Sequence, residues 1–317
     1  MLNIVFLDKS TVGDVPNIEK LGKFGKLALY DTSTPSEALT RAADADIIVT
    51  NKVVIDRSIM DNAPRLRLIC VTATGMNNID LDYAGKMGIP VKNVAGYSTN
   101  SVAQTTFTML FYLMGQVKYY DDYVKSGRYA GSPIFTHFAR PFIELHGKIF
   151  GIIGLGTIGK KVATIARSFG SEIIYYSTSG KNHDLAYKEV GLPELLSRSD
   201  IISIHAPLND NTRNLIGRTE LSNMKPTAYL VNAGRGGIVN ETDLADALDK
   251  NLIAGAALDV LTKEPIAPDN PLTRVRNKDR LLIMPHNAWA SLEARTVLID
   301  KVCENIEEFI ININRSR

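Results

Sequence analysis

The sequence has few of the residues that mark disulfide-stabilised, metal-binding or membrane-spanning proteins. Its 317 residues include two cysteines and one tryptophan. Cys70 and Cys303 stand alone, without the spacing of a metal or redox pair, so we expect no metal site and a buried thiol at Cys70. No apolar run reaches membrane-spanning length, and the first residues lack the basic and apolar segments of a signal peptide. These absences predict a soluble cytoplasmic protein.

Charge of either sign is also not in excess. The chain has 36 basic and 34 acidic side chains, a formal charge of +2. This balance gives no electrostatic reason to expect nucleic acid or an anionic membrane as a partner. With 45% hydrophobic residues, a chain of this length can form two domains with cores of their own.

The first hundred residues alternate short apolar runs with helical patterns. Such alternation predicts a parallel sheet covered by helices on both faces. The segment after it, 100–127, predicts one long apolar-rich helix. The expected strands are 3–8, 27–31, 46–51, 66–73 and 89–94, and the expected helices between them are 35–44 and 80–88.

A second alternating series begins near residue 148. Six strands with intervening helices predict a doubly wound, dinucleotide-binding sheet. The last segment, 291–314, has apolar residues at the spacing of an amphipathic helix, including Val297, Leu298, Val302 and Ile306. The six expected strands are 148–154, 171–177, 200–207, 228–234, 253–260 and 280–286.

A glycine pattern lies at the first strand-to-helix junction of this series. Gly154, Gly156 and Gly159 have the G-x-G-x-x-G spacing, after an expected strand and before an expected helix. Gly154 would allow a tight turn, Gly156 a close approach to a pyrophosphate, and Gly159 close packing of helix and strand. The phosphates would meet free N–H groups at the positive end of the helix. A glycine turn without a ligand is the alternative, but the context favours a dinucleotide site.

The sequence lacks the acidic residue that usually follows such a loop by about 20 residues and binds the ribose hydroxyls. Ser177 stands there instead, while Glu172 lies before the expected strand and Asp184 well beyond its end. A serine can hydrogen-bond a ribose hydroxyl but cannot repel a 2′-phosphate. Thr178 and Lys181 could help to accept that phosphate, although no arginine follows. We therefore expect NAD as the cofactor, with NADP tolerated.

Three ionisable residues come after the last three strands of the second series. Each of Arg235, Glu264 and His286 has an ordinary interpretation alone, but at one edge of a parallel sheet they indicate a site. An arginine binds a carboxylate through two parallel hydrogen bonds, and a histidine beside a carboxylate can exchange a proton near neutral pH. Together with a nicotinamide, this set predicts hydride transfer to the carbonyl of a 2-oxo acid.

Several segments resemble, in order and spacing, the motifs of the D-isomer specific 2-hydroxyacid dehydrogenases. They are "GLGTIG", "VNAGRGGIVNETDL", "AALDVLTKEP" and "MPHNAWAS". The resemblance covers nearly the whole chain and implies an NAD(P)-dependent oxidoreductase of two doubly wound α/β domains with a cleft between them. Residues 1–98 and 291–317 would form a smaller, flavodoxin-like substrate domain, and 99–290 a Rossmann domain. The family also implies a homodimer.

By this resemblance, Arg235 binds the substrate carboxylate and polarises the carbonyl, His286 is the acid/base, and Glu264 pairs with it. Asp259 matches a position that holds the nicotinamide carboxamide, and His205 lies on a strand beside the cofactor in a structural role. The resemblance implies cofactor contacts from Gly154, Gly156, Thr157, Ile158, Gly159, Ser177, Thr178, His205, Pro207, Thr212, Asn232, Ala233, Asp259 and His286.

Fewer residues indicate how the substrate binds. The resemblance implies that backbone at Thr74 and Gly75, in "TATGMNNID", meets the substrate carboxylate. Lys52, just after an expected strand, would approach an anionic substrate or be a solvated lysine. Trp289, three residues after His286, would shape the substrate pocket or pack at the start of the last helix.

Within the family, "TATGMNNIDL", "YSTNSVAQTTF" and "PHNAWAS" look most like bacterial glycerate dehydrogenases, also called hydroxypyruvate reductases. The resemblance thus implies reversible conversion of hydroxypyruvate to D-glycerate. Glyoxylate, pyruvate or a bulkier 2-oxo acid are alternative substrates. A cofactor-sensing regulatory protein is the alternative from another class, because some co-repressors resemble this family and retain the Arg, Glu and His set.

Overall fold

The computed structural model describes residues 1–315 and divides the chain into two units. The first unit contains Met1–Ser98 and the chain from Ala290 onward, and the second contains Thr99–Trp289. Each unit is built on one parallel sheet with helices on both faces, which confirms the expected fold class. No helix within residues 1–315 combines the length and the apolar character needed to cross a bilayer.

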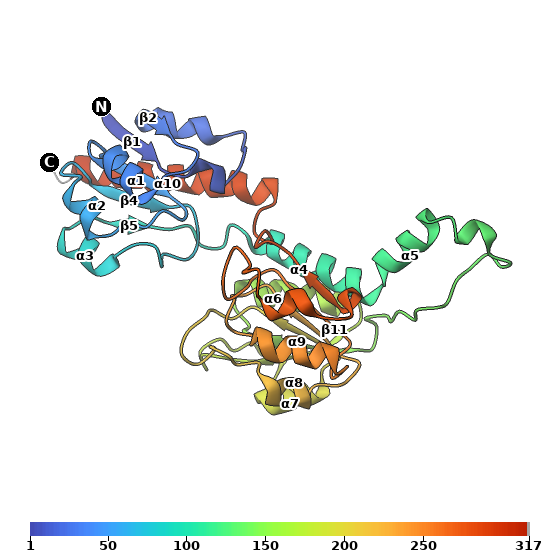
Figure 1. Cartoon of the computed structure of the whole chain (residues 1–317). Helices are drawn as coiled ribbons and strands as arrows, with labels where there is room; N and C mark the ends of the chain where they lie inside the picture. Colours follow the sequence, from blue (N-terminus) through green and yellow to red (C-terminus); the bar gives the residue numbers. More distant parts are fainter. Residues whose placement is uncertain (316–317) are drawn as a thin grey trace. The chain divides into compact units, whose positions relative to one another are not determined.

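The sheet of the first unit has five strands in the order β2-β1-β3-β4-β5 (Figure 1). All strands are parallel, but the order in which successive strands are added reverses between β1 and β3, so the loops after these two strands leave in opposite directions at this switch point. Short, almost wholly buried strands such as β3 and β4 need apolar residues on both faces, which the sequence supplies. The strands are β1 (Leu2–Phe6), β2 (Gly25–Leu29), β3 (Ile47–Thr50), β4 (Leu68–Val71) and β5 (Val91–Lys92).

Helices from both ends of the chain cover this sheet. The helices α1, α2 and α3 pack on one face, and the last helix, α10, packs against β4 and the 3-10 helix η2. Leu298, Val302 and Ile306 of α10 are fully buried, as the amphipathic pattern predicts. Val297 is 42% exposed, so of these four residues it alone does not belong to the buried face. Cys70 is fully buried, and burial raises the pKa of its thiol to about 12. These helices are α1 (Pro35–Ala42), α2 (Arg57–Asp61), α3 (Leu81–Lys86), η2 (Ile18–Phe24) and α10 (Leu292–Arg315).

The sheet of the second unit has seven strands in the order β12-β11-β10-β9-β6-β7-β8, all parallel. Six were expected. The seventh, β8, was missed because it is a two-residue, exposed and charged edge strand without an apolar signal. The strands are β6 (Ile149–Ile153), β7 (Glu172–Tyr176), β8 (Lys188–Glu189), β9 (Ile201–Ile204), β10 (Tyr229–Asn232), β11 (Gly255–Leu258) and β12 (Leu281–Ile283).

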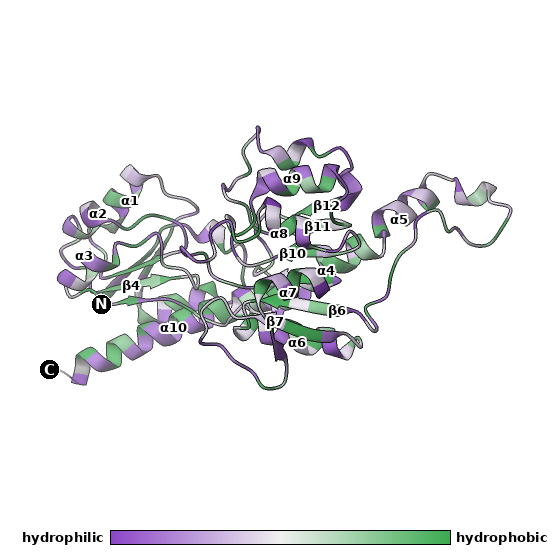
Figure 2. Ribbon diagram, turned by 90° about the horizontal axis from the view of Figure 1, so that it is seen from below, coloured by the Kyte–Doolittle hydropathy of each residue, from purple (hydrophilic) through white to green (hydrophobic). Residues whose placement is uncertain are grey.

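Two apolar cores lie on the two faces of this sheet. Helices α4 and α6 pack on one face, and α7, α8 and α9 pack on the other. Figure 2 shows hydrophilic and hydrophobic residues alternating along these helices. The strand order reverses between β6 and β9, and a doubly wound sheet binds its ligand at such a point. The helices are α4 (Thr99–Met114), α6 (Thr157–Ser168), α7 (Leu192–Arg198), α8 (Arg218–Asn223) and α9 (Glu241–Asp249).

The long helix expected over 100–127 is two helices, α4 and α5 (Val117–Lys125). The break lies at Gly115 and Gln116, and Gln116 has a left-handed φ of 51°. The Leu113 carbonyl, in the last turn of α4, accepts both the backbone N–H and the side-chain amide of Gln116. The apolar pattern continues through the break, so periodicity alone could not locate it.

Candidate active site

The glycine loop forms the cradle that the sequence predicts. Gly154 has a φ of 91°, and a methyl group on it would lie 2.8 Å from the Ala206 nitrogen. A methyl group on Gly159 would lie 2.3 Å from the Gly154 carbonyl oxygen. On Gly156, by contrast, it would have no atom within 4 Å. Two glycines are thus required by the fold itself, whereas Gly156 borders open space, and the approach of a pyrophosphate there stays a prediction.

The first turn of α6 adds the electrostatic part of this cradle. Gly156 is its N-cap, no side chain caps it, and its first turn contains no acid. Free backbone N–H groups and the positive helix end thus remain available to an anion. Thr157 is exposed and Ile158 packs partly against the core below, and their contact with a cofactor stays a prediction. The donors fit the pyrophosphate of a nicotinamide dinucleotide.

The end of β7 supplies a free hydroxyl beside this loop. The Gly154 N–H donates to the Tyr176 carbonyl at 3.0 Å, which fixes the strand end against the glycine turn. The hydroxyl of Ser177 is buried and has no hydrogen-bond partner among the described residues. Thr178 is half-buried. A buried hydroxyl without a partner is costly, and a ribose hydroxyl would satisfy it.

His205 lies at the reversal point, directly after β9 and against Gly154. Its Nε2 atom lies 2.8 Å from the Ser203 hydroxyl, while Nδ1 is buried without a partner. Burial lowers the pKa of His205 to about 3. The ring is therefore neutral at physiological pH, which agrees with a structural role and does not suit a proton donor.

The loop after β10 presents Arg235. Asn232 is buried and binds the loop twice, since its side chain donates to the Arg235 carbonyl and accepts from the Gly234 N–H, each at 3.0 Å. Any side chain at Gly236 would collide with the Leu261 carbonyl at 1.9 Å. The Arg235 guanidinium donates to the Gly234 carbonyl and has no acid as an ion-pair partner within residues 1–315. A rigid loop thus holds an arginine available for an external carboxylate.

The next two strand ends bring His286 and Glu264 into contact. The Nδ1 atom of His286 lies 2.6 Å from Glu264 Oε2, and both side chains are about one-third exposed. Oε1 of Glu264 accepts the Leu261 N–H at 2.8 Å, which orients the carboxylate. Nδ1 is therefore occupied, and Nε2 is the atom left to exchange a proton with a substrate.

Asp259 positions His286 from the neighbouring strand end. Its carbonyl accepts the His286 N–H at 2.8 Å, and its buried carboxylate accepts the N–H groups of Asn287 and Ala288. His286 has a left-handed φ of 53°, which is uncommon for a residue other than glycine. Asp259 stabilises that turn because it accepts the N–H groups of three consecutive residues, 286–288. Burial raises the pKa of Asp259, although the two N–H donors oppose this effect.

The remaining residues expected at the cofactor have partners within their own loops. The Thr212 hydroxyl is buried, donates to the Pro207 carbonyl at 2.7 Å and accepts the Asn209 N–H. Pro207 is exposed, and Ala233 is buried in the core below β10. These residues shape the loops after β9 and β10, and their direct contact with a cofactor stays a prediction.

Trp289 packs partly against the core formed by α4 and α6. The role of Trp289 in the substrate pocket stays a prediction. The preceding residue is also anchored, because the Ala288 carbonyl accepts the Ser101 hydroxyl at 2.6 Å. The end of β12 is thereby fixed to α4.

In the first unit, Lys52 follows β3, and Thr74 and Gly75 follow β4. Asp8, which sequence reasoning treated only as the end of a strand, is buried and accepts the N–H groups of residues 51–53 with its carboxylate. It thereby fixes the loop that carries Lys52, whose ammonium has no ion-pair partner within residues 1–315. The sequence did not indicate this role, because the hydrogen bonds that define it join segments more than 40 residues apart along the chain.

The strand ends of the second unit therefore combine an anion cradle, an available arginine and a histidine oriented by a carboxylate. All of them follow parallel strands, and they therefore lie at the carboxyl-terminal end of the same sheet. The family model for the D-isomer specific 2-hydroxyacid dehydrogenase NAD binding domain matches residues 107–288. That segment contains every one of these groups.

Proteins of known sequence and structure resemble the chain along nearly its whole length. A glyoxylate reductase from Aeropyrum pernix is 38% identical, with 92% of this chain and 89% of the relative covered. A hydroxypyruvate reductase from Blautia hydrogenotrophica is 36% identical, with 92% and 91% covered. The crystal structure of a D-lactate dehydrogenase from Aquifex aeolicus complexed with NAD and lactic acid superposes with a TM-score of 0.83 at 27% identity, covering 98% and 96%.

Proposed function

Because the chain belongs to the D-isomer specific 2-hydroxyacid dehydrogenase family, and is therefore an oxidoreductase with a nicotinamide cofactor, we propose that it interconverts hydroxypyruvate and D-glycerate. The observation that carries the chemistry is the contact of 2.6 Å between His286 and Glu264 at the edge that also presents Arg235. The relatives support reduction of small 2-oxo acids, and the sequence motifs favour hydroxypyruvate among them.

The protein's own groups do three things in this proposal. Arg235 binds the substrate carboxylate and draws electron density from the adjacent carbonyl. Nε2 of His286 gives a proton to the carbonyl oxygen in reduction and takes it back in oxidation. Glu264 keeps the ring oriented and stabilises the imidazolium form that reduction consumes. When bound, the nicotinamide supplies or accepts the hydride.

The cofactor proposal assigns each part of a dinucleotide to groups described above. The pyrophosphate meets the N–H groups at Gly156, Thr157 and Ile158, and the adenosine ribose meets the Ser177 hydroxyl. Asp259 lies beside His286 with part of its acceptor capacity unused, which suits it to a carboxamide. Lys52, Thr74 and Gly75 would contribute to substrate binding from the first unit.

Parallel assays of cofactor oxidation test the substrate. Purified protein is mixed with NADH or NADPH and with hydroxypyruvate, glyoxylate or pyruvate, and kcat/KM is measured for each pair. We expect the highest value for hydroxypyruvate with NADH. A higher kcat/KM for glyoxylate would make the protein a glyoxylate reductase with the same chemistry. Tight cofactor binding without turnover of any 2-oxo acid would favour a sensor over an enzyme.

We also propose a cytoplasmic location and a homodimer. The proposal of a homodimer is based on residues 117–143. We call this segment, α5 with the 3-10 helix η3 (Tyr129–Gly131) and the chain to Ile143, the arm; Figure 1 shows it extending away from the sheet of its unit. Water meets most of the surface of Phe135, Phe138 and Phe142, which are 89%, 78% and 63% exposed. Such an apolar patch marks a protein interface, and a second copy is the commonest partner.

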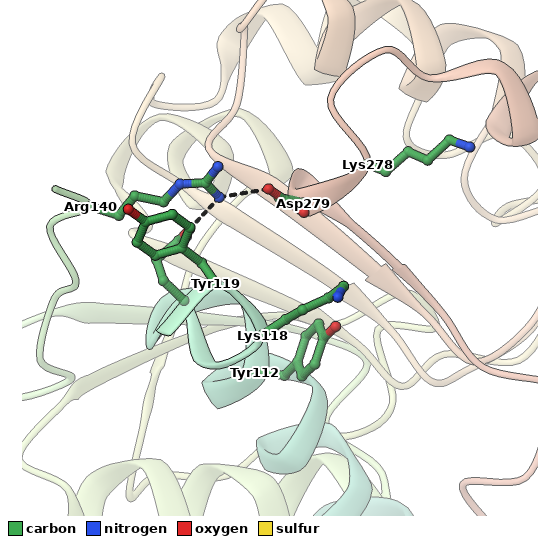
Figure 3. A pocket seen from close by; sticks show the side chains of 7 residues that line it. Tyr112, Lys118, Tyr119, Arg140, Lys278 and Asp279 are labelled. Carbon is green, nitrogen blue, oxygen red and sulfur yellow. Dashed lines mark hydrogen bonds and ion pairs between the residues drawn. The ribbon is translucent and has the colours of Figure 1, made fainter. Parts of the chain in front are cut away.

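The arm is held in shape although much of it is irregular. The rings of Tyr123 and His137 stack at 3.8 Å, and the Tyr119 hydroxyl lies 2.8 Å from the His137 Nε2 atom. Figure 3 shows Arg140 lying over Tyr119 and reaching Asp279, with an Arg140–Asp279 distance of 2.6 Å. Tyr119, Arg140 and Asp279 line a cavity of about 180 Å³ at the base of the arm. A preformed arm loses little conformational entropy when it docks.

A further inference from the structure

An acidic residue does lie beside α6, the helix that follows the glycine loop, although it does not come from the end of β7. Asp184 lies seven residues beyond Ser177. Its Oδ2 atom is 3.0 Å from the Nζ atom of Lys160. Lys160 belongs to the first turn of α6, because its N–H donates to the Gly156 carbonyl at 2.9 Å. The acid therefore pairs with a side chain of the helical turn that follows the glycine loop.

The loop that carries Asp184 is fastened along one side of α6. Lys160, Thr164 and Arg167 are spaced so that they share one face of the helix. Asp184 contacts the first, the Tyr187 hydroxyl lies 3.4 Å from the hydroxyl of the second, and the guanidinium of the third lies 5.4 Å from the Tyr187 ring centre. Several contacts therefore fix the position of the loop.

The same loop is also fastened to β7 and β8. The Asp184 N–H donates to the Tyr175 hydroxyl at 3.1 Å, and that hydroxyl donates to Glu189. His183 bridges Glu189, at 2.7 Å, and the Gly180 carbonyl, at 2.9 Å. Asp184 itself accepts the Ala186 N–H, and this bond together with Lys160 lowers the pKa of Asp184. Asp184 is thus a fixed, ionised carboxylate.

We propose that the Lys160–Asp184 pair sets the preference for NAD over NADP, so that Asp184 takes the part of the acid missing at Ser177. The inference rests on the cofactor site proposed above. Asp184 acts in two ways: it engages the ammonium of Lys160, which would otherwise be available to a 2′-phosphate, and it repels that phosphate directly. Lys160 is 46% exposed, so without Asp184 its side chain would be free to turn toward the ribose.

Lys181 is the cation that opposes this effect. It is exposed, and no acid pairs with it within residues 1–315. A lysine alone offers a hydrated point charge and cannot grip a phosphate as an arginine does. The net charge of Lys160, Lys181 and Asp184 is therefore +1, and replacing the acid with a neutral side chain doubles it. This is the change that favours a 2′-phosphate.

Calorimetric titration of the full-length protein with NADH and with NADPH tests the proposal without substrate. In Asp184→Asn, we expect NADPH to bind about tenfold more tightly and NADH to change by less than about threefold, since one unit charge acts on a doubly charged phosphate. Asp246→Asn is the matched control: Asp246 is an ion-paired acid of the same unit, on α9, bonded to Lys250 and Arg218. It should leave both affinities unchanged.

A second substitution isolates Lys160. In the double variant Asp184→Asn with Lys160→Met, the gain in NADPH affinity should disappear, because the freed ammonium is gone. An unchanged ratio of NADPH to NADH affinity in Asp184→Asn, with NADH still bound, would overturn the inference and leave the proposed function intact. If the wild-type protein bound neither nucleotide, the cofactor site itself would be wrong, and the inference with it.

Discussion

Acidification should destabilise the second unit through His205. In the unfolded chain a histidine has a pKa of about 6.5, whereas burial lowers the pKa of His205 in the folded protein to about 3. Between these values the unfolded chain binds a proton that the folded protein does not. Stability is therefore complete above about pH 6.5 and is lost progressively as the pH falls toward 3.

The size of the effect follows from the same two values. At pH 5, about 1.5 units below the pKa of the unfolded chain, protonation stabilises the unfolded chain by about 2 kcal/mol. The free energy of unfolding falls by the same amount. His205 is partly exposed as a residue although its Nδ1 atom is buried, so this figure is an upper value. Carboxylates change the stability over the same range, and a variant must separate the two.

Urea denaturation of wild type and His205→Gln, at pH 8 and at pH 5, makes that separation. Trp289 is the only tryptophan and lies in the same unit as His205, so its fluorescence reports unfolding of the relevant unit. We expect the wild type to lose up to about 2 kcal/mol more than the variant between the two pH values. Equal losses, within about 0.5 kcal/mol, would show that His205 is protonated in the folded protein and refute the reasoning.

Three further predictions concern the cradle, the substrate arginine and the arm. Gly156→Ala should fold normally but bind NADH at least about tenfold more weakly by titration, whereas Gly159→Ala should lose about 1–3 kcal/mol of stability by urea denaturation, because its methyl group meets the Gly154 carbonyl. Arg235→Lys should lower kcat/KM for hydroxypyruvate about a hundredfold while NADH affinity is kept, since an ammonium cannot form two parallel bonds to a carboxylate. Phe138→Ser should raise the dimer dissociation constant about a thousandfold in analytical ultracentrifugation, because each copy loses about 2 kcal/mol of apolar burial and a two-fold interface contains two copies.

Each of these has a result that contradicts it. Unchanged NADH affinity in Gly156→Ala would place the pyrophosphate elsewhere. Full activity of Arg235→Lys would remove the bidentate role. A wild-type protein that is monomeric, or a dimer as sensitive to Val54→Ser as to Phe138→Ser, would exclude the arm as the interface, because Val54 is 59% exposed but lies in the first unit.

Most of the fold could be predicted from the sequence, because buried parallel strands are continuous apolar runs. The strands Ile47–Thr50 and Ile201–Ile204 are examples. It missed β8 and the break at Gln116, where the deciding contacts are local and polar. It also correctly placed His286 and Glu264 at neighbouring strand ends, and their contact followed from the parallel sheet.

Roles that depend on tertiary contacts were not visible in the sequence. Asp8 is the end of a strand by pattern, yet its carboxylate fixes the loop of Lys52. Asp184 is too far along the chain to be the expected acid, and only the folding of its loop over α6 brings it to Lys160. Counting residues from a motif gives positions along a strand, whereas a loop can return to the site from further away.

We propose that His286 exchanges the proton in hydride transfer to a 2-oxo acid. It is tested most directly by measuring NADH titration and hydroxypyruvate reduction in His286→Ala and in wild type. We expect NADH affinity within about threefold of wild type and a kcat lower by about a hundredfold or more, since general acid catalysis by one side chain typically contributes that much. A His286→Ala protein that binds NADH and reduces hydroxypyruvate at the wild-type rate would contradict the account.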